Sequence, residues 1–198
     1  SNPMGLDSQI MGVQTGYNNI HTNQQNCWNW NRITNLKDEP SQEGHWIKTL
    51  LDLAKPADII LDLHTAGAEA VPHIYSHVTE IKHAEGLGIP HVLAWNNPSY
   101  SFADTHHQLD KIALTFELSS SRSVRLEWVE ESLIYLRRFF GILPKVEGSR
   151  TWQVENQIKK WFSPEGGVLC WNIDAGDSVS EGDVIATLYN RQGRVELE

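Results

Sequence analysis

The order of apolar and polar positions predicts a helix and then a strand early in the chain. Between residues 41 and 55, apolar side chains recur at intervals of one, three and four, which predicts a helix that stops at Pro56. Residues 58–63 follow, with an uninterrupted aliphatic run at residues 59–61. Such a run is typical of a strand that is buried on both faces of a parallel sheet, so we expect an interior strand here.

The middle of the chain alternates short apolar runs with polar stretches. Strands are expected at residues 91–95 and 111–118, and a short helix at residues 78–85. The polar stretches 66–77 and 96–107 have no clear period, and we expect loops there.

Residues 122–143 are expected to form the longest helix. Apolar residues recur every three or four positions and form one stripe: Leu126, Val129, Leu133, Leu136 and Phe140. Strands that alternate with helices imply a layered α/β fold.

The C-terminal part has a different pattern, with short alternating strands and paired glycines. Gly176-Asp177 and Gly182-Asp183 are turn signals of a small all-β module. We place the boundary near Glu147, so that residues 1–147 form the α/β domain and residues 148–198 the small β domain.

Composition narrows the class of protein. The chain has 198 residues, a formal net charge of −9, an apolar fraction of 40% and 8 Trp, which is enough for a core and argues against nucleic acid or an anionic membrane as partner. The 2 Cys residues make no disulfide framework, so we expect a reducing, cytoplasmic location. No run is long enough to cross a bilayer, and no secretory signal is present.

Two predicted strands end in residues that could bind a metal ion or take part in catalysis. The run 58–63 leads into Asp62-Leu63-His64-Thr65, and ligand sites of open α/β sheets lie beyond the carboxyl ends of strands. Asp62 is on the same side as His64, where a carboxylate could orient a metal-binding imidazole. The alternative is a histidine that only caps a strand. Glu117 ends the strand 111–118, and its alternative is a solvated glutamate.

A long loop, rich in Asn, Gln and Gly, reaches to about Asn35. Within it, Asn31 and Arg32 combine an amide with a planar cation, a pair that suits a carboxylate ligand. The alternative is a solvated loop. Loops of this length inside a compact domain are usually functional.

Four motifs in order carry a resemblance to a known family: Asn2-Pro3 with Gly5, residues 29–32, residues 62–65 and residues 116–118. The chain resembles the succinylglutamate desuccinylase/aspartoacylase family, which are zinc-carboxypeptidase-like N-acyl amino acid deacylases. The resemblance implies a layered α/β/α sandwich of the zinc-carboxypeptidase kind. It also implies a small C-terminal β domain of the barrel-sandwich, lipoyl-like type.

The resemblance further implies a zinc-dependent hydrolase that cleaves the amide bond of an N-acyl amino acid. It makes His64 a Zn²⁺ ligand, Glu117 the general base and acid, and Asn31 and Arg32 the grip on the substrate carboxylate. Zinc lowers the pKa of a bound water to about 7, and a carboxylate can then move its proton.

The sequence departs from the family pattern in three places. The family's His-x-x-Glu zinc ligands lie upstream of the Asn-Pro motif, and nothing precedes Ser1. A family arginine is missing from residues 16–18, and the β module stops at residues 195–198 within a predicted strand. We therefore expect a fragment truncated at both ends that binds zinc weakly and is inactive by itself.

Two other functions stay open. One is a zinc carboxypeptidase that acts on peptides, and the other is a non-catalytic pseudoenzyme or binding protein. A carrier-type β module would need a lysine at a hairpin tip, and no lysine follows Lys160. The substrate is expected to be a small molecule, and a homo-oligomer is compatible with the sequence.

Overall fold

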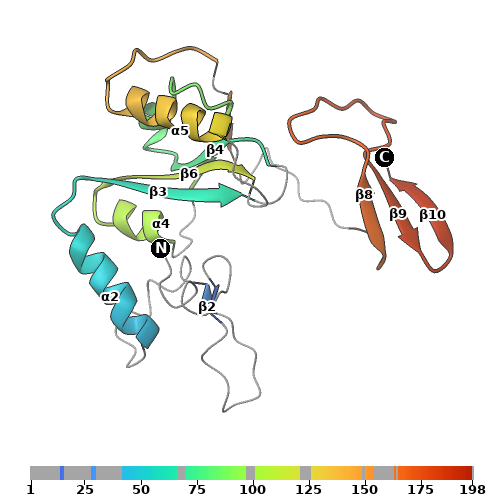
Figure 1. Cartoon of the computed structure of the whole chain (residues 1–198), viewed down its shortest axis with the longest axis horizontal. Helices are drawn as coiled ribbons and strands as arrows, with labels where there is room; N and C mark the ends of the chain where they lie inside the picture. The colour runs from blue at the N-terminus through green and yellow to red at the C-terminus, as the bar shows by residue number, and fades with distance from the viewer. Residues whose placement is uncertain are drawn as a thin grey trace. The chain divides into compact units, whose positions relative to one another are not determined.

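The structure is a computed structural model of the whole chain (Figure 1). It describes residues 14–15, 28–29, 42–66, 70–96, 101–120, 126–148, 150–153, 163 and 165–197. The chain divides into two compact units. The first comprises Ser1–Asp62, Tyr75–Ala84 and Trp95–Thr115, and the second comprises Leu63–Ile74, Glu85–Ala94 and Phe116–Glu198.

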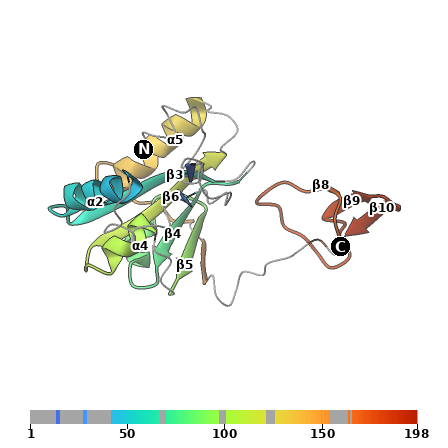
Figure 2. The ribbon, with the colours of Figure 1, turned by 90° about the horizontal axis from the view of Figure 1, so that it is seen from below.

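A five-stranded sheet has the order β3-β6-β4-β5-β7, and Figure 2 shows its first four strands in this order. The strands are β3 (Ile59–Ala66), β6 (Ile112–Ser120), β4 (His73–His77), β5 (His91–Trp95) and β7 (Arg150–Gln153). β7 runs parallel to β5. A mixed α/β architecture, as expected from the alternating pattern, is therefore confirmed.

The interior position expected for the strand at residues 58–63 is wrong for the part of the chain that the structure describes. β3 is at the edge of the sheet, and its side chains alternate between a buried Ile60 and exposed Ile59 and Leu63, which are 38% and 51% exposed. An aliphatic run shows only that both faces of the strand are apolar. It does not show whether a second strand pairs with each edge or whether a helix covers each face.

Four helices accompany this sheet in the described residues: α2 (Gln42–Ala54), α3 (Ile81–Ala84), α4 (Phe102–His107) and α5 (Leu126–Phe139). α2 and the strand β5 match their predictions closely. The two expected loops are partly wrong, because the first contains β4 and the second contains α4. In β4 the buried residues Ile74 and Ser76 alternate with histidines and a tyrosine, which hides the apolar period.

A small cluster anchors the start of β3 in the first unit. Ile60, Ala103 and Ala113 are buried together, and Phe102 packs against them with Ala54 and Ala57. The backbone N–H of Ile112 donates to the carbonyl of Asp58 at 3.2 Å, where β3 and β6 begin.

The stripe predicted on the longest helix does not face a core. Tyr135 is the buried residue of α5, and Phe139 meets Phe116 at a ring-centroid distance of 6.3 Å. Leu126, Val129 and Leu133 are exposed instead. Two aromatic residues outside the stripe take the inner position, which an aliphatic period alone does not reveal.

The C-terminal residues form a separate three-stranded antiparallel sheet of order β10-β9-β8. Its strands are β8 (Val168–Trp171), β9 (Ala186–Asn190) and β10 (Gly193–Leu197). Ala186, Leu188 and Leu197 form its core.

Both Gly-Asp pairs are turns, as predicted. The carboxylates of Asp177 and Asp183 accept hydrogen bonds from backbone N–H groups three residues upstream, at 2.8 and 2.7 Å. Gly176 and Gly182 have φ of 98° and 89°, a region that favours glycine.

The sheet pairing extends beyond the expected boundary at Glu147, because β7 belongs to the five-stranded sheet. The division at that residue stays a prediction. β1 (Gln14–Thr15) and β2 (Trp28–Asn29) form one short antiparallel pair. Among the described helices, none combines the length and apolar character needed to cross a membrane.

Candidate functional site

His64 and Glu117, the two predicted strand-end residues, lie on neighbouring strands. His64 is near the end of β3 and Glu117 is in the second half of β6. The bond from Ile112, the first residue of β6, to Asp58, the residue before β3, joins the N-terminal ends of both strands, so the strands run in the same direction. The ladder bonds of a parallel pair are evenly spaced.

This bond also sets the register of the pair. In a parallel ladder, a carbonyl accepts from the residue that follows its opposite partner, so Asp58 lies opposite Lys111. His64 follows Asp58 by as many residues as Glu117 follows Lys111, so His64 lies opposite Glu117. Opposite residues of paired strands have side chains on the same face, so imidazole and carboxylate are neighbours on one face.

The same face can be followed back along β3. Side chains of a strand alternate, so Ile60, Asp62 and His64 point to one side. Ile60 is buried in the cluster with Ala103, whereas Asp62 and His64 are half-buried. The face thus changes along the strand from apolar and packed to polar and partly accessible, as a reaction site requires.

A histidine beside a carboxylate can bind a cation or move a proton. A hydrolytic zinc site uses three protein ligands and one open position. In the described ranges, no group of three His, Cys, Asp or Glu residues is arranged to hold a metal ion. His64 therefore does not form a complete zinc site with the described residues alone.

Asn31 and Arg32, which are predicted to bind the substrate carboxylate, lie outside the described residues. The neighbouring Asn29 is the last residue of β2, opposite Gln14 of β1. The roles of Asn31 and Arg32 stay a prediction.

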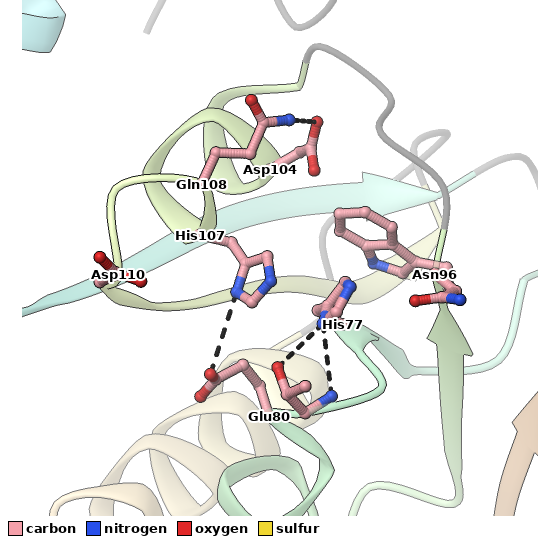
Figure 3. Close-up of a pocket in the computed structure, with 9 residues that line it drawn as sticks. His77, Glu80, Asn96, Asp104, His107, Gln108 and Asp110 are labelled. Carbon is pink, nitrogen blue, oxygen red and sulfur yellow. Dashed lines mark hydrogen bonds and ion pairs between the residues drawn. The ribbon is translucent and has the colours of Figure 1, made fainter.

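A pocket of about 490 Å³ lies elsewhere in the first unit (Figure 3). Its lining includes neither His64 nor Glu117. The lining residues are His77, Thr79, Glu80, Trp95, Asn96, Asp104, His107, Gln108 and Asp110.

Two stacked imidazoles form the centre of this pocket (Figure 3). The rings of His77 and His107 are 3.9 Å apart with an interplanar angle of 26°, and the Trp95 ring meets His77 edge-on at 5.3 Å. The backbone N–H of Thr79 donates to His77 Nδ1 at 3.3 Å, so the proton of a neutral His77 is on Nε2.

Glu80 lies between one histidine of the pocket and one outside its lining. Its carboxylate is 3.9 Å from His107 Nδ1 and 3.6 Å from His83 Nε2. Stacked rings direct their nitrogen lone pairs alongside each other, not toward one point, so His77 and His107 are a poor pair of metal ligands. The sequence did not single out this pocket, because its contacts depend on how β4, β5 and α4 assemble.

His106, next to the stack, is buried in α4. Its Nδ1–H donates to the carbonyl of Phe102 at 2.8 Å, and the Phe102 ring is 4.4 Å away. Burial lowers the pKa of His106 below its ordinary value, and the nearby Lys111 lowers it too, although the bond to Phe102 acts in the opposite direction.

His91 at the start of β5 also has a lowered pKa, mainly through burial and then through His73 and Arg150. The indole N–H of Trp152 donates to His91 Nδ1 at 3.2 Å, and the Arg150 guanidinium lies 4.1 Å over the Trp152 ring. These contacts join β5 and β7 and explain His91 as a structural residue.

No protein-family model and no curated protein matches the chain. Solved structures do match it. A succinylglutamate desuccinylase from Silicibacter sp. TM1040 superposes with a TM-score of 0.71 at 19% identity, over 87% of this chain and 59% of that one. A succinylglutamate desuccinylase/aspartoacylase from Rhodobacter sphaeroides gives 0.67 at 17% identity, over 87% and 60%.

The product-bound ectoine utilization protein EutE (DoeB) from Ruegeria pomeroyi gives a TM-score of 0.62 at 20% identity, over 85% of this chain and 59% of that one. The chain thus spans about 60% of the length of the solved structures it matches. At these identities the comparison establishes the fold. The chain has the fold of succinylglutamate desuccinylase/aspartoacylase structures, which is the group that its four motifs resemble.

Proposed function

We propose that this chain is part of a zinc-dependent hydrolase that cleaves the amide bond of an N-acyl amino acid. The observation that supports it most is the neighbouring position of His64 and Glu117 on β3 and β6, within a fold shared with desuccinylase structures. We extend this to a zinc-carboxypeptidase-like α/β/α sandwich followed by a barrel-sandwich β domain.

Glu117 would act as the base and then as the acid. It would take a proton from the attacking water as the water oxygen bonds to the amide carbon. It would then give this proton to the amide nitrogen as the C–N bond breaks. The products are a carboxylic acid and an amino acid. Asn31 and Arg32 would hold the substrate carboxylate, because a guanidinium can bind it through two parallel hydrogen bonds.

His64 is the residue we propose as a ligand of the metal. When bound, zinc would polarise the scissile carbonyl and lower the pKa of water to about 7. One imidazole does not offset the dehydration of the ion. At least one further donor would have to come from residues outside the described part of the chain, since the described residues hold no group of three suitable ligands.

The test is an assay of the complete gene product against three sets of substrates. These are N-acetyl and N-succinyl amino acids, acylated dipeptides, and unmodified peptides, each with and without a zinc chelator. We expect release of the amino acid from the first set, and loss of this activity with the chelator. Release of C-terminal residues from the peptides would favour the carboxypeptidase instead. No turnover of any set, with no bound zinc, would favour the non-catalytic alternative.

A further inference from the structure

The aliphatic stripe of α5 is left exposed. Leu126 is 72% exposed, Val129 42%, Leu133 46% and Phe140, one residue after the helix, 60%. Leu136, the remaining member of the stripe, is half-buried. A monomer normally shows such apolar side chains singly, so a continuous row of them indicates an interaction surface.

α5 does not need this stripe to hold its own position. Tyr135 and Phe139 face inward, and Phe139 meets Phe116. The Arg138 guanidinium donates to the Leu87 carbonyl at 3.0 Å. The helix is therefore anchored by one side, and the aliphatic side remains available for a partner.

The spacing of the stripe fits another helix. Its members follow one another at intervals of three, four, three and four residues, which is the spacing of a coiled-coil seam. Two such helices pack with the side chains of one between those of the other. A flat surface or a sheet would not require this period.

Charged residues beside the stripe indicate that the partner helix is a second copy of α5. Glu130 and Arg137 are both exposed. They are seven residues apart, so they lie at the same heptad position along one flank of the seam. Their charges are opposite. When two copies of α5 pack antiparallel, Glu130 of each copy meets Arg137 of the other, and a two-fold axis produces this contact twice.

The apolar layers agree with the same register. In an antiparallel pair that brings Glu130 to the second copy's Arg137, Leu133 lies beside the second copy's Leu136. Val129 lies beside the second copy's Phe140. Charges and apolar layers therefore specify one alignment.

We propose that two copies of this chain associate through α5, packed antiparallel about a two-fold axis. This surface contains neither His64 nor Glu117, so the inference does not depend on the proposed function. Its two apolar layers are short, and the association is accordingly concentration-dependent.

The test is sedimentation equilibrium of the complete gene product over a range of concentrations, with five variants. Glu130→Arg and Arg137→Glu each bring like charges together at both contacts, and each should weaken the dimer at least roughly ten-fold. The double variant exchanges the two charges and should restore it. Glu127→Arg makes the same charge change on the adjacent turn, away from the flank contact, and should leave the dimer nearly unchanged.

Leu133→Asp should give a monomer, and its far-ultraviolet circular dichroism should show that the fold is retained, because this side chain is already exposed. A chain that is monomeric at every concentration would overturn the proposal, as would cover of the stripe by another segment of the same protein. A dimer that Glu130→Arg, Arg137→Glu and Leu133→Asp all leave unchanged would overturn it too. Failure of the double variant to recover would reject the antiparallel register.

Discussion

His106 shows how a single buried residue can link the fold to pH. Only 1% of its surface is exposed, and its bond to Phe102 holds the ring within α4. The lowered pKa means that the folded chain takes up this proton less readily than the unfolded chain, whose histidine titrates near 6.5.

The sign of the effect on stability follows from this difference. Below about pH 6.5 the unfolded state binds the proton and the folded state does not, so stability falls as the pH drops from 6.5 toward the folded-state pKa. One proton of difference corresponds to at most about 1.4 kcal/mol per pH unit. We expect chemical denaturation at pH 7.5 and pH 5.5 to show this loss.

His106→Asn should reduce the pH dependence, because the amide N–H can still donate to Phe102 and no longer titrates near neutral pH. His45→Asn, at an exposed position on α2, is the matched control and should keep the wild-type slope. Equal slopes for both variants would contradict this account of His106.

At the scale of elements, Lys111 ties the end of α2 to the start of β6. Its ammonium donates to the carbonyls of Ala54, Lys55 and Ala57 at 2.9, 2.7 and 2.6 Å. The last carbonyls of a helix have no intrahelical partner, and a cation at this end is also favoured by the helix dipole.

Lys111→Met should therefore destabilise the fold by about 1–3 kcal/mol, since it removes a charged donor that three carbonyls at the end of the helix share, two of them partly buried. Urea denaturation measures this. Lys55→Met is the control. It removes an exposed ion pair with Asp52, and such pairs contribute about 0–1 kcal/mol. A smaller loss for Lys111→Met than for Lys55→Met would refute the capping role.

Elements with a clean apolar period could be predicted from the sequence, and those without one could not. α2 and β5 lie close to their expected bounds. β4 was missed because its outward residues are polar and its inward residues include Ser76. α4 has only six residues, too few for a helical period to appear. Which face of β3 or α5 is covered depends on distant segments.

At the scale of the whole molecule, part of the candidate site could be predicted. Polar residues that follow aliphatic runs indicate strand ends, and this singled out His64 and Glu117, whose strands β3 and β6 are neighbours. Their roles stay predictions. The pocket around His77 and His107 could not be predicted, because its two rings come from elements 30 residues apart in the chain. Residues 31 and 32 are outside the described part.

The central claim is that Glu117 moves protons and His64 binds the metal. The most direct test measures zinc content by elemental analysis and turnover of an N-acyl amino acid, both on the complete gene product. Glu117→Gln should keep about one zinc per chain and lose at least roughly 100-fold in turnover. His64→Ala should lose both zinc and turnover, because it removes a ligand. Full activity in Glu117→Gln, or full zinc in His64→Ala, would contradict the mechanism.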